Sequence, residues 1–411
     1  MTSTSIDTPL DTPRRSRRRT LLLAVLGAGA LTAGLLGANA AVKRHDGGHR
    51  TNPVLQRNVD ALTALGATGV QARLSGPDGL DVTAVGGVAD TTSRQAVPAN
   101  GYFRIASMTK AFVATVVLQL VADGKLSLDD TVESRLPGVV SGNGNDGRAI
   151  TVRDLLQHRS GLHDDYPDYT SEEDFRKHRN DTVTPQQTVA RAMAHQPDFK
   201  PGTNWNYDNT GYVLLGMMIE RVTGHPWHQE VRERIVRPLG LDHTSRPGTD
   251  PTLPQPHAAT YQRFQEGGPL VDVTEQVGAG TNGEAGLIST TADLDRFLQG
   301  LLGGRLLPPA QLALMQQTVP VGQDFEQLMP GARDGLGLFS RPLSCGGVYW
   351  GHEGGDSGWI TATGVTADGR RAVTVSLSGV RIAGPEDVVR IAAAENKLVD
   401  DALCDAKDGG K

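Results

Sequence analysis

Strand-forming segments stand at both ends of this 411-residue chain, and a long helix-rich stretch separates them. Near the start, two apolar runs at 69–74 and 80–88 flank the turn Gly76-Pro77-Asp78-Gly79, which predicts a β-hairpin. Four more strands are predicted in the last third, at 336–339, 348–351, 359–365 and 372–377. This order predicts a mixed α/β (α+β) fold in which both ends of the chain build one antiparallel sheet flanked by helices.

The middle of the chain has a different composition from its ends. Residues 124–280 are rich in Pro, Asp, Gly and His and contain only short helical pieces. Long helical patterns stand outside this region, at 107–122 and 386–404. We therefore predict a sheet domain made of residues 53–123 and 281–411, with residues 124–280 inserted as a helix-rich domain.

The first 40 residues have the properties of an export signal. They carry five arginines against two aspartates, and the stretch Leu21–Val42 after them has no charged side chain. Ala38-Asn39-Ala40 has the small-x-small pattern that a signal peptidase cleaves, and the arginine run resembles a twin-arginine signal. We predict a signal peptide at 1–40, a flexible stalk at 41–52 and an extracytoplasmic location. The alternative is a retained transmembrane anchor.

Cysteine usage agrees with export. The chain has two cysteines, Cys345 and Cys404, both in its last fifth. In an exported protein such a pair predicts a disulfide, and two buried free thiols are the alternative.

Charge and motif content exclude several function classes. The formal net charge is −6, so the chain lacks the basic character that nucleic-acid binding requires. No serine has glycine at both −2 and +2, and no Gly-rich phosphate loop ends in Lys-Ser or Lys-Thr. His225 and His228 are interrupted by Pro226 and do not form a persuasive metal-ligand pattern. We predict neither a metal ion nor a cofactor.

One short motif points to nucleophilic catalysis. Ser107-Met108-Thr109-Lys110 is the only Ser-x-x-Lys in the chain and opens the predicted helix at 107–122. Residues i and i+3 share a helix face, so the Lys110 amine can reach the Ser107 hydroxyl. A desolvated lysine loses its charge more readily and can activate that hydroxyl, and the helix N-terminus favours developing negative charge. The alternative is a helix-capping serine beside a solvated lysine.

Two further motifs follow in order along the chain. Tyr207-Asp208-Asn209 is the only Tyr-x-Asn, and His352-Glu353-Gly354 precedes a predicted strand. Taken singly, these are equally consistent with a core tyrosine and a strand-edge histidine. All three motifs together are improbable by chance, which favours a catalytic set.

Longer phrases around these motifs carry a family resemblance. They are FRIASMTK at 103–110, LLQHRSGL at 155–162, NYDNTGY at 206–212, GLIST at 286–290 and GHEGGDSGW at 351–359. The chain resembles the serine β-lactamase and penicillin-binding-protein superfamily from about Asn58 to Cys404. It is most similar to the branch of class C β-lactamases and actinomycete extracellular D-alanyl-D-alanine carboxypeptidases, whose fold it is therefore predicted to share.

The resemblance implies a role for each motif residue. Ser107 would be the nucleophile that forms an acyl-enzyme. Lys110 and the Tyr207 phenol would accept its proton, with the nearby ammonium lowering the pKa of the phenol. Asn209 would orient the substrate amide. His352 would relay protons or hold Tyr207 in place.

The resemblance also implies substrate contacts and structural residues. Backbone N–H groups of Ser107 and Gly355 would form the oxyanion hole, and glycine at 354 would let substrate backbone lie close to the strand. His158 is predicted to be structural, with its ring bonded to backbone. Cys345 and Cys404 are similar in position to the disulfide of actinomycete carboxypeptidases of this branch.

Glu353 departs from the family pattern. Carboxypeptidases of this branch carry a hydroxyl residue there, which donates to the terminal carboxylate of the substrate. A glutamate would repel that carboxylate unless a cation compensates, and we predict Arg341 as the compensating and substrate-binding cation. Phe339 stands where the family carboxypeptidases carry a carboxylate-binding arginine.

These observations predict an exported serine hydrolase. The first expectation is a D-alanyl-D-alanine carboxypeptidase that acts on cell-wall-type peptides and also binds penicillin. The alternatives are an esterase or D-amino-acid amidase of the same fold, a class C-like β-lactamase, and a non-catalytic penicillin-binding receptor. The predicted partner is a small peptide, ester or β-lactam substrate, without nucleic acid, and the protein is predicted to be a monomer.

Overall fold

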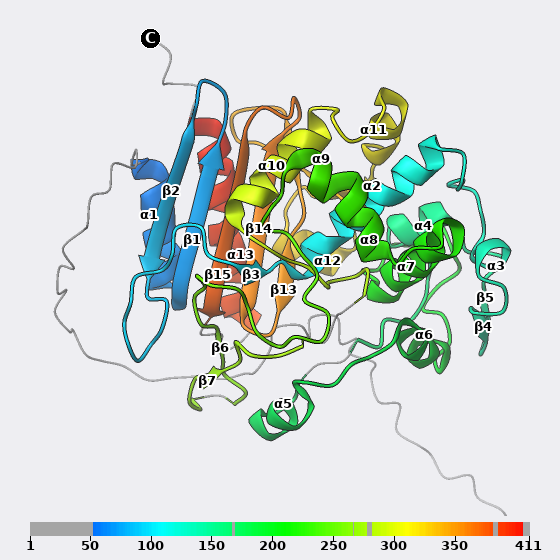
Figure 1. The fold of residues 1–411 in the computed structure, drawn as a ribbon, viewed down its shortest axis with the longest axis horizontal. Coiled ribbons are helices and arrows are strands. Elements are labelled where there is room, and N and C mark those ends of the chain that lie inside the picture. Colours follow the sequence, from blue (N-terminus) through cyan, green and yellow to red (C-terminus); the bar gives the residue numbers. More distant parts are fainter. Residues whose placement is uncertain (1–51, 167–168, 266, 278–281, 381–384, 406–411) are drawn as a thin grey trace, which may run out of the picture.

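The computed structural model describes residues 52–405, except 167–168, 266, 278–281 and 381–384 (Figure 1). The predicted signal peptide, and the predicted stalk apart from Asn52, lie outside the described residues. No helix in the described ranges is both long and apolar enough to span a membrane.

One antiparallel sheet of nine strands holds the described part of the chain together (Figure 1). Its strands follow the order β2-β1-β15-β14-β12-β11-β10-β9, and β13 pairs with β14 beside this row. β1 pairs with β15 along its length, so the sheet joins the two ends of the chain as predicted. The strands are β1 Ala67–Ser75, β2 Asp81–Gly87, β9 Val319–Pro320, β10 Arg333–Asp334, β11 Phe339–Pro342, β12 Val348–Gly351, β13 Gly354–Asp356, β14 Trp359–Thr366 and β15 Ala372–Val380.

Helices cover both faces of this sheet. α1 Pro53–Ala64 and α13 Pro385–Cys404 pack on one face, and α10 Thr291–Leu302 packs on the other (Figure 1). Apolar side chains from the strands and from α1 and α13 fill the first interface, and they are almost completely buried. Burial of each large aliphatic side chain stabilises the fold by about 1.5–3 kcal/mol.

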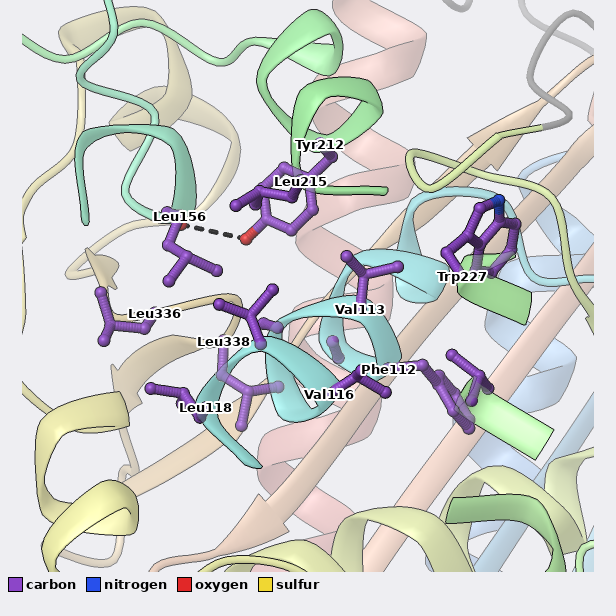
Figure 2. Packing of buried hydrophobic residues seen from close by; sticks show 14 of the residues in the cluster. Phe112, Val113, Val116, Leu118, Leu156, Tyr212, Leu215, Trp227, Leu336 and Leu338 are labelled. Carbon is purple, nitrogen blue, oxygen red and sulfur yellow. Dashed lines mark hydrogen bonds between the residues drawn. The ribbon is translucent and has the colours of Figure 1, made fainter. Parts of the chain in front are cut away.

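α2 Thr109–Ala122 is the centre of a second core. Nearly all of its residues are buried, because the helix is apolar on every side and is enclosed by α7 Asn209–Thr223, α8 Trp227–Val231 and α11 Pro309–Met315. Figure 2 shows Val113 and Leu118 of α2 among side chains from α7, α8 and the segment 336–338. The Tyr212 hydroxyl donates to the Leu156 carbonyl at 3.0 Å, so the buried phenol of Tyr212 has a hydrogen-bond partner within this core (Figure 2).

Shorter elements complete the described ranges. The helices are α3 Val132–Arg135, α4 Val152–Leu156, α5 Glu172–His178, α6 Pro185–Met193, α9 Arg237–Leu239 and α12 Gln323–Leu328, with a 3-10 turn η1 at Ala106–Met108 and a π turn η2 at Arg232–Val236. Three two-stranded ribbons pair β3 Phe103–Arg104 with β8 Ile288–Ser289, β4 Ser141–Gly142 with β5 Asn145–Asp146, and β6 Tyr261–Gln262 with β7 Val271–Asp272.

The predicted fold class is confirmed, and one strand prediction needs correction. β11 begins at Phe339, whereas the sequence predicted a strand at 336–339. Gly337 adopts φ +87°, and a Cβ there would lie 2.3 Å from the Ala114 Cβ. Leu336 and Leu338 pack into the core around α2, so the apolar run serves that core and not the sheet.

A disulfide joins the turn between β11 and β12 to the end of α13. It links Cys345 to Cys404, as the sequence predicted, and the described residues contain no free cysteine. Closing a loop of 59 residues stabilises a fold by roughly 4 kcal/mol in the chain-entropy model. The bond therefore holds α13 against the part of the sheet that carries Arg341 and His352.

Candidate active site

Ser107 lies where the chain turns from β3 into α2. The η1 turn makes this connection, and Ala106 within it has a left-handed backbone with φ +46°. A non-glycine residue in this region costs about 1–3 kcal/mol and persists only where its surroundings enforce it. The turn leaves the Ser107 side chain half-buried and within hydrogen-bond distance of Lys110.

Lys110 is fully buried, and its ammonium has three hydrogen-bond acceptors. Nζ donates to Ser107 Oγ at 2.9 Å, to Asn209 Oδ1 at 2.7 Å and to the Glu284 carbonyl at 2.9 Å. Burial lowers the pKa of Lys110 to about 8, although nearby carboxylates, Glu284 first, oppose this shift. A lysine with this pKa is partly neutral near pH 7 and can accept the Ser107 proton.

Asp164, which the sequence analysis did not single out, fixes Asn209. Its Oδ2 accepts from Asn209 Nδ2 at 2.8 Å, and its Oδ1 accepts from the Asn209 backbone N–H at 3.0 Å. The amide oxygen of Asn209 is thereby turned toward Lys110. Asn209 is the first residue of α7, which Asp208 caps by accepting from Gly211 N–H at 3.0 Å. The start of α7 and the Asp164 carboxylate together fix the orientation of the Asn209 side-chain amide.

Tyr207 is stacked on two other rings. The His158 ring lies 4.3 Å away at 28°, and the Phe325 ring lies 5.7 Å away at 11°. His158 Nδ1 also accepts from the Asp208 backbone N–H, which agrees with the structural role predicted for this residue. Burial and stacking therefore hold the phenol ring in one orientation.

The prediction that Lys110 lowers the pKa of the Tyr207 phenol is wrong. Burial raises the pKa of Tyr207 well above its usual value, even though hydrogen bonding to Ser107 opposes this shift. Lys110 Nζ lies 5.0 Å from the ring centroid, and its three hydrogen bonds go to other groups. Tyr207 is consequently protonated at neutral pH and able to donate a proton, while Lys110 is better suited to accept one.

His352 is buried and neutral. Its Nδ1 is bonded to the Glu353 carbonyl, which can only accept, so Nδ1 carries the proton. Burial and the Lys110 charge lower the pKa of His352 to about 3. Nε2 is buried and bonds to no described residue. The ring centroids of His352 and Tyr207 are 6.4 Å apart.

The two predicted substrate-binding glycines lie on β13, next to the turn that carries the nucleophile. A Cβ on Gly354 would lie 2.2 Å from the Ile105 carbonyl oxygen, so only glycine fits this close approach. A Cβ on Gly355 would meet no atom within 4 Å, and this residue is exposed. The strand therefore presents open backbone beside Ser107.

Arg341 is engaged by protein groups. Its Nη1 donates to Asn396 Oδ1 at 2.6 Å and lies 3.4 Å from Glu353 Oε1. Burial raises the pKa of Glu353 and raises that of neighbouring Glu395 to about 8. Arg341 thus compensates Glu353, as predicted. Its predicted contact with substrate would require a guanidinium that is already bonded.

The arrangement suits acyl transfer. A serine hydroxyl faces a lysine of lowered pKa, a protonated phenol lies beside the same hydroxyl, and open strand backbone runs past both. No group of three His, Cys, Asp or Glu side chains in the described ranges is placed to hold a metal ion.

Comparison with known proteins identifies the family. Residues 55–395 match the family model described as Beta-lactamase. The chain belongs to this family. It has the fold of the serine hydrolases in the β-lactamase and penicillin-binding-protein superfamily, and the resemblance seen in the sequence is confirmed.

The more similar proteins include both penicillin-binding proteins and amidases. The chain is 32% identical to penicillin-binding protein 4 of Amycolatopsis lactamdurans over 64% of this chain and 68% of that protein. It spans less than half the length of several other curated relatives. A D-stereospecific amidohydrolase from Streptomyces sp. is 38% identical, with TM-score 0.74 over 83% of this chain and 98% of its own. The D-amino acid amidase of Ochrobactrum anthropi is 27% identical, with TM-score 0.74 over 86% and 99%.

Sequence analysis found the motif residues and missed the groups that hold them. Ser107, Lys110 and Asn209 meet through direct hydrogen bonds, as their motifs imply. Asp164 follows the LLQHRSGL phrase closely, which was the one available signal for it. Nothing in the sequence marked Phe325, because its partner Tyr207 is more than a hundred residues away.

Proposed function

We propose that the protein is a serine amidohydrolase that acts on amino-acid derivatives of D configuration through an acyl-enzyme on Ser107. Two similar solved structures, the Streptomyces amidohydrolase and the Ochrobactrum amidase, are enzymes of D-stereospecific amide chemistry by name, and each is covered almost completely by this chain. The disulfide supports the export predicted from the N-terminal sequence, because such bonds persist in oxidising compartments.

The observation that carries the proposal is the Arg341–Glu353 pair. A carboxypeptidase must hold a terminal carboxylate, which a cation beside the scissile bond would favour. Here the guanidinium already bonds Glu353 and Asn396. Asp164 and Glu284 both interact with Lys110 and add negative charge near it, although burial raises the pKa of both and brings that of Glu284 to about 7. This electrostatic environment suits a substrate with a free ammonium and an uncharged amide.

The geometry gives each group one task. Neutral Lys110 takes the Ser107 proton as Oγ forms a bond to the carbonyl carbon of the substrate. The C–N bond then breaks, its electron pair stays on nitrogen, and Tyr207 donates a proton to the leaving amine. A proton passing from Lys110 to Tyr207 restores both groups, and water cleaves the acyl-enzyme by the same roles. Backbone N–H groups of Ser107 and Gly355 are the proposed donors to the oxyanion.

A D-alanyl-D-alanine carboxypeptidase is the second candidate. It is favoured by the similarity to penicillin-binding protein 4, which covers about two thirds of both chains. The two candidates share the nucleophile and the base and differ in the leaving group.

The test compares leaving groups and configurations in one assay. Rates of hydrolysis are measured for D-phenylalanine amide, L-phenylalanine amide and an N-acylated D-Ala-D-Ala peptide, with full-length wild type, Ser107→Ala and the exposed control Ser141→Ala. We expect the D-amide to be preferred, and Ser107→Ala alone to lose about 10⁴-fold or more in kcat. Faster cleavage of the D-Ala-D-Ala peptide would establish the second candidate. Failure to turn over any of the three, with a stable penicillin adduct in the intact mass, would indicate a receptor.

A further inference from the structure

A short helix carries an aromatic side chain to the catalytic phenol. α12 Gln323–Leu328 contains no fully buried residue, yet its Phe325 ring lies 5.7 Å from Tyr207 and nearly parallel to it. The same ring is 5.1 Å from Trp205 and 5.1 Å from Phe339 on β11. Phe325 is half-buried, so part of its apolar surface stays accessible. One side of Phe325 packs against the apolar cluster of Trp205, Met329 and Phe339, and the rest of the ring is the part that can contact a bound molecule.

Four rings close around this place. Phe339 lies 5.1 Å from His352, so Tyr207, Phe325, Phe339 and His352 form a continuous set of ring contacts. Two of these rings belong to the proton-transfer machinery and two are plain phenyl groups. Phe339 and His352 are buried, whereas Tyr207 and Phe325 keep part of their surface accessible. The accessible surface of the set therefore belongs to Tyr207 and to the phenyl group of Phe325 stacked beside it.

The hydrogen bonds that hold α12 in place involve Asn396 and Arg341, and Arg341 also pairs with Glu353. Asn396 on α13 accepts from Arg341 at 2.6 Å and donates through Nδ2 to the Leu328 carbonyl at 2.9 Å. The end of α12 is further fixed by Glu326 Oε1, which accepts from Gly331 N–H at 2.8 Å. One set of contacts thus positions Phe325 and keeps the guanidinium of Arg341 engaged.

We propose that Phe325, supported from inside the protein by buried Phe339, forms an apolar wall of the leaving-group pocket and makes the enzyme select uncharged, apolar amines and alcohols over leaving groups that carry a carboxylate. The leaving atom must lie next to Tyr207, because that phenol supplies its proton. Whatever is attached to that atom then lies against Phe325. An apolar group buries surface there, whereas a carboxylate would be desolvated near Glu353, which already pairs with the Arg341 guanidinium. The inference rests on the proposed function and specifies its substrates.

The experiment uses two amides that differ in the charge of the amine they release. kcat/KM is measured for D-phenylalanine benzylamide and for D-phenylalanyl-glycine with full-length wild type, Phe325→Ala, Phe325→Leu and the exposed control Gln327→Ala on the same helix. We expect wild type to prefer the benzylamide by about 10- to 100-fold. Phe325→Ala should reduce that ratio about tenfold, mainly through KM, and Phe325→Leu should restore part of it. Gln327→Ala should keep the wild-type ratio.

Two results would overturn the pocket. A wild-type preference for the glycine leaving group is one of them. The other is an equal loss of kcat on both amides in Phe325→Ala, which would make Phe325 a positioning residue for Tyr207.

Failure of the proposed function gives a different result. If L-amides are cleaved as fast as D-amides, the D-amidase proposal fails while the leaving-group ratio still tests Phe325. If no amide is cleaved, the same variants are compared on benzyl and carboxymethyl esters, and the ratio of these two rates tests the role of Phe325.

Discussion

The two walls of the candidate site differ in how fully their buried polar groups are hydrogen-bonded. On the helical wall, formed by Ser107, Lys110, Asp164 and Asn209, every Lys110 proton has an acceptor and both Asp164 oxygens have donors. Beside this wall, one buried atom, Glu284 Oε2, bonds to no described residue. On the strand wall, formed by Arg341, His352, Glu353, Gly354 and Gly355, three buried polar atoms bond to no described residue. They are Arg341 Nε, His352 Nε2 and Glu353 Oε2.

This difference indicates that the helical wall carries out proton transfer and that the strand wall selects the substrate. A buried polar atom that stays without any partner costs about 1–3 kcal/mol. The helical wall is organised for proton transfer before substrate arrives. The strand wall carries the polar groups that no described side chain bonds, so substrate specificity is expected to depend on it more than proton transfer does.

Removing the base should have the largest effect. Lys110→Met keeps the length of the side chain but removes the amine, so nothing can accept the Ser107 proton. We expect kcat to fall about 10³- to 10⁴-fold, within the range of general-base contributions. Initial rates on a chromogenic ester measure it, with Lys397→Met as the exposed control, since Lys397 pairs only with Asp401 on the surface. A loss below tenfold would show that another group is the base.

The pH dependence tests the same wall in the unaltered protein. Because Lys110 must be neutral to act, and burial lowers its pKa to about 8, kcat/KM should rise with pH and level off above pH 8. Below that value the rate should fall toward tenfold for each pH unit. An ester without ionisable groups keeps the substrate out of the profile. A rate that falls as pH increases through 8 would mean that the charged lysine is the active form.

On the strand wall, the largest expected effect is on stability. Arg341→Met removes the cation between Glu353 and Glu395, and breaking a buried pair costs about 3–5 kcal/mol. Because Glu353 is about a quarter exposed, we expect about 2–3 kcal/mol, measured from urea denaturation against exposed Arg333→Met. Both carboxyl groups have raised pKa values, so the loss should shrink as pH decreases and they become neutral. An unchanged midpoint at pH 9 would contradict this account.

The same contrast decides what could be predicted from the sequence. The spacing of Ser107 and Lys110 is a local property of a helix, so their meeting was predictable. The hairpin and the closing helix follow equally local patterns. The direction of the Tyr207 pKa shift was mispredicted, because it depends on how deeply the phenol is buried, which no local pattern contains. Phe325 was missed for a related reason. α12 is short, and the role of Phe325 depends on its contact with the Tyr207 ring, which is distant in sequence.

The smallest expected effect concerns the residue that orients Asn209. Asp164→Asn keeps the shape of the side chain but removes the charge that makes Asn209 point its NH₂ group away from Lys110. The Asn209 amide can then rotate, and each rotation places NH₂ instead of oxygen against the ammonium. We expect kcat to fall about tenfold with little change in KM, because a misplaced positioning group costs rate before affinity.

Its neighbour supplies the matched control. Asp165 pairs with Arg191 at 3.1 Å on a more open part of the surface, so Asp165→Asn should change kcat by less than twofold. The pH profile adds a readout that a purely structural role would not change. The Asp164 carboxylate favours the charged form of Lys110, so neutralising it should lower the pKa of Lys110 further and shift the rise in kcat/KM to lower pH. A tenfold loss without that shift would mean that Asp164 supports only the fold of its loop, and that Asn209 is held by the start of α7 alone.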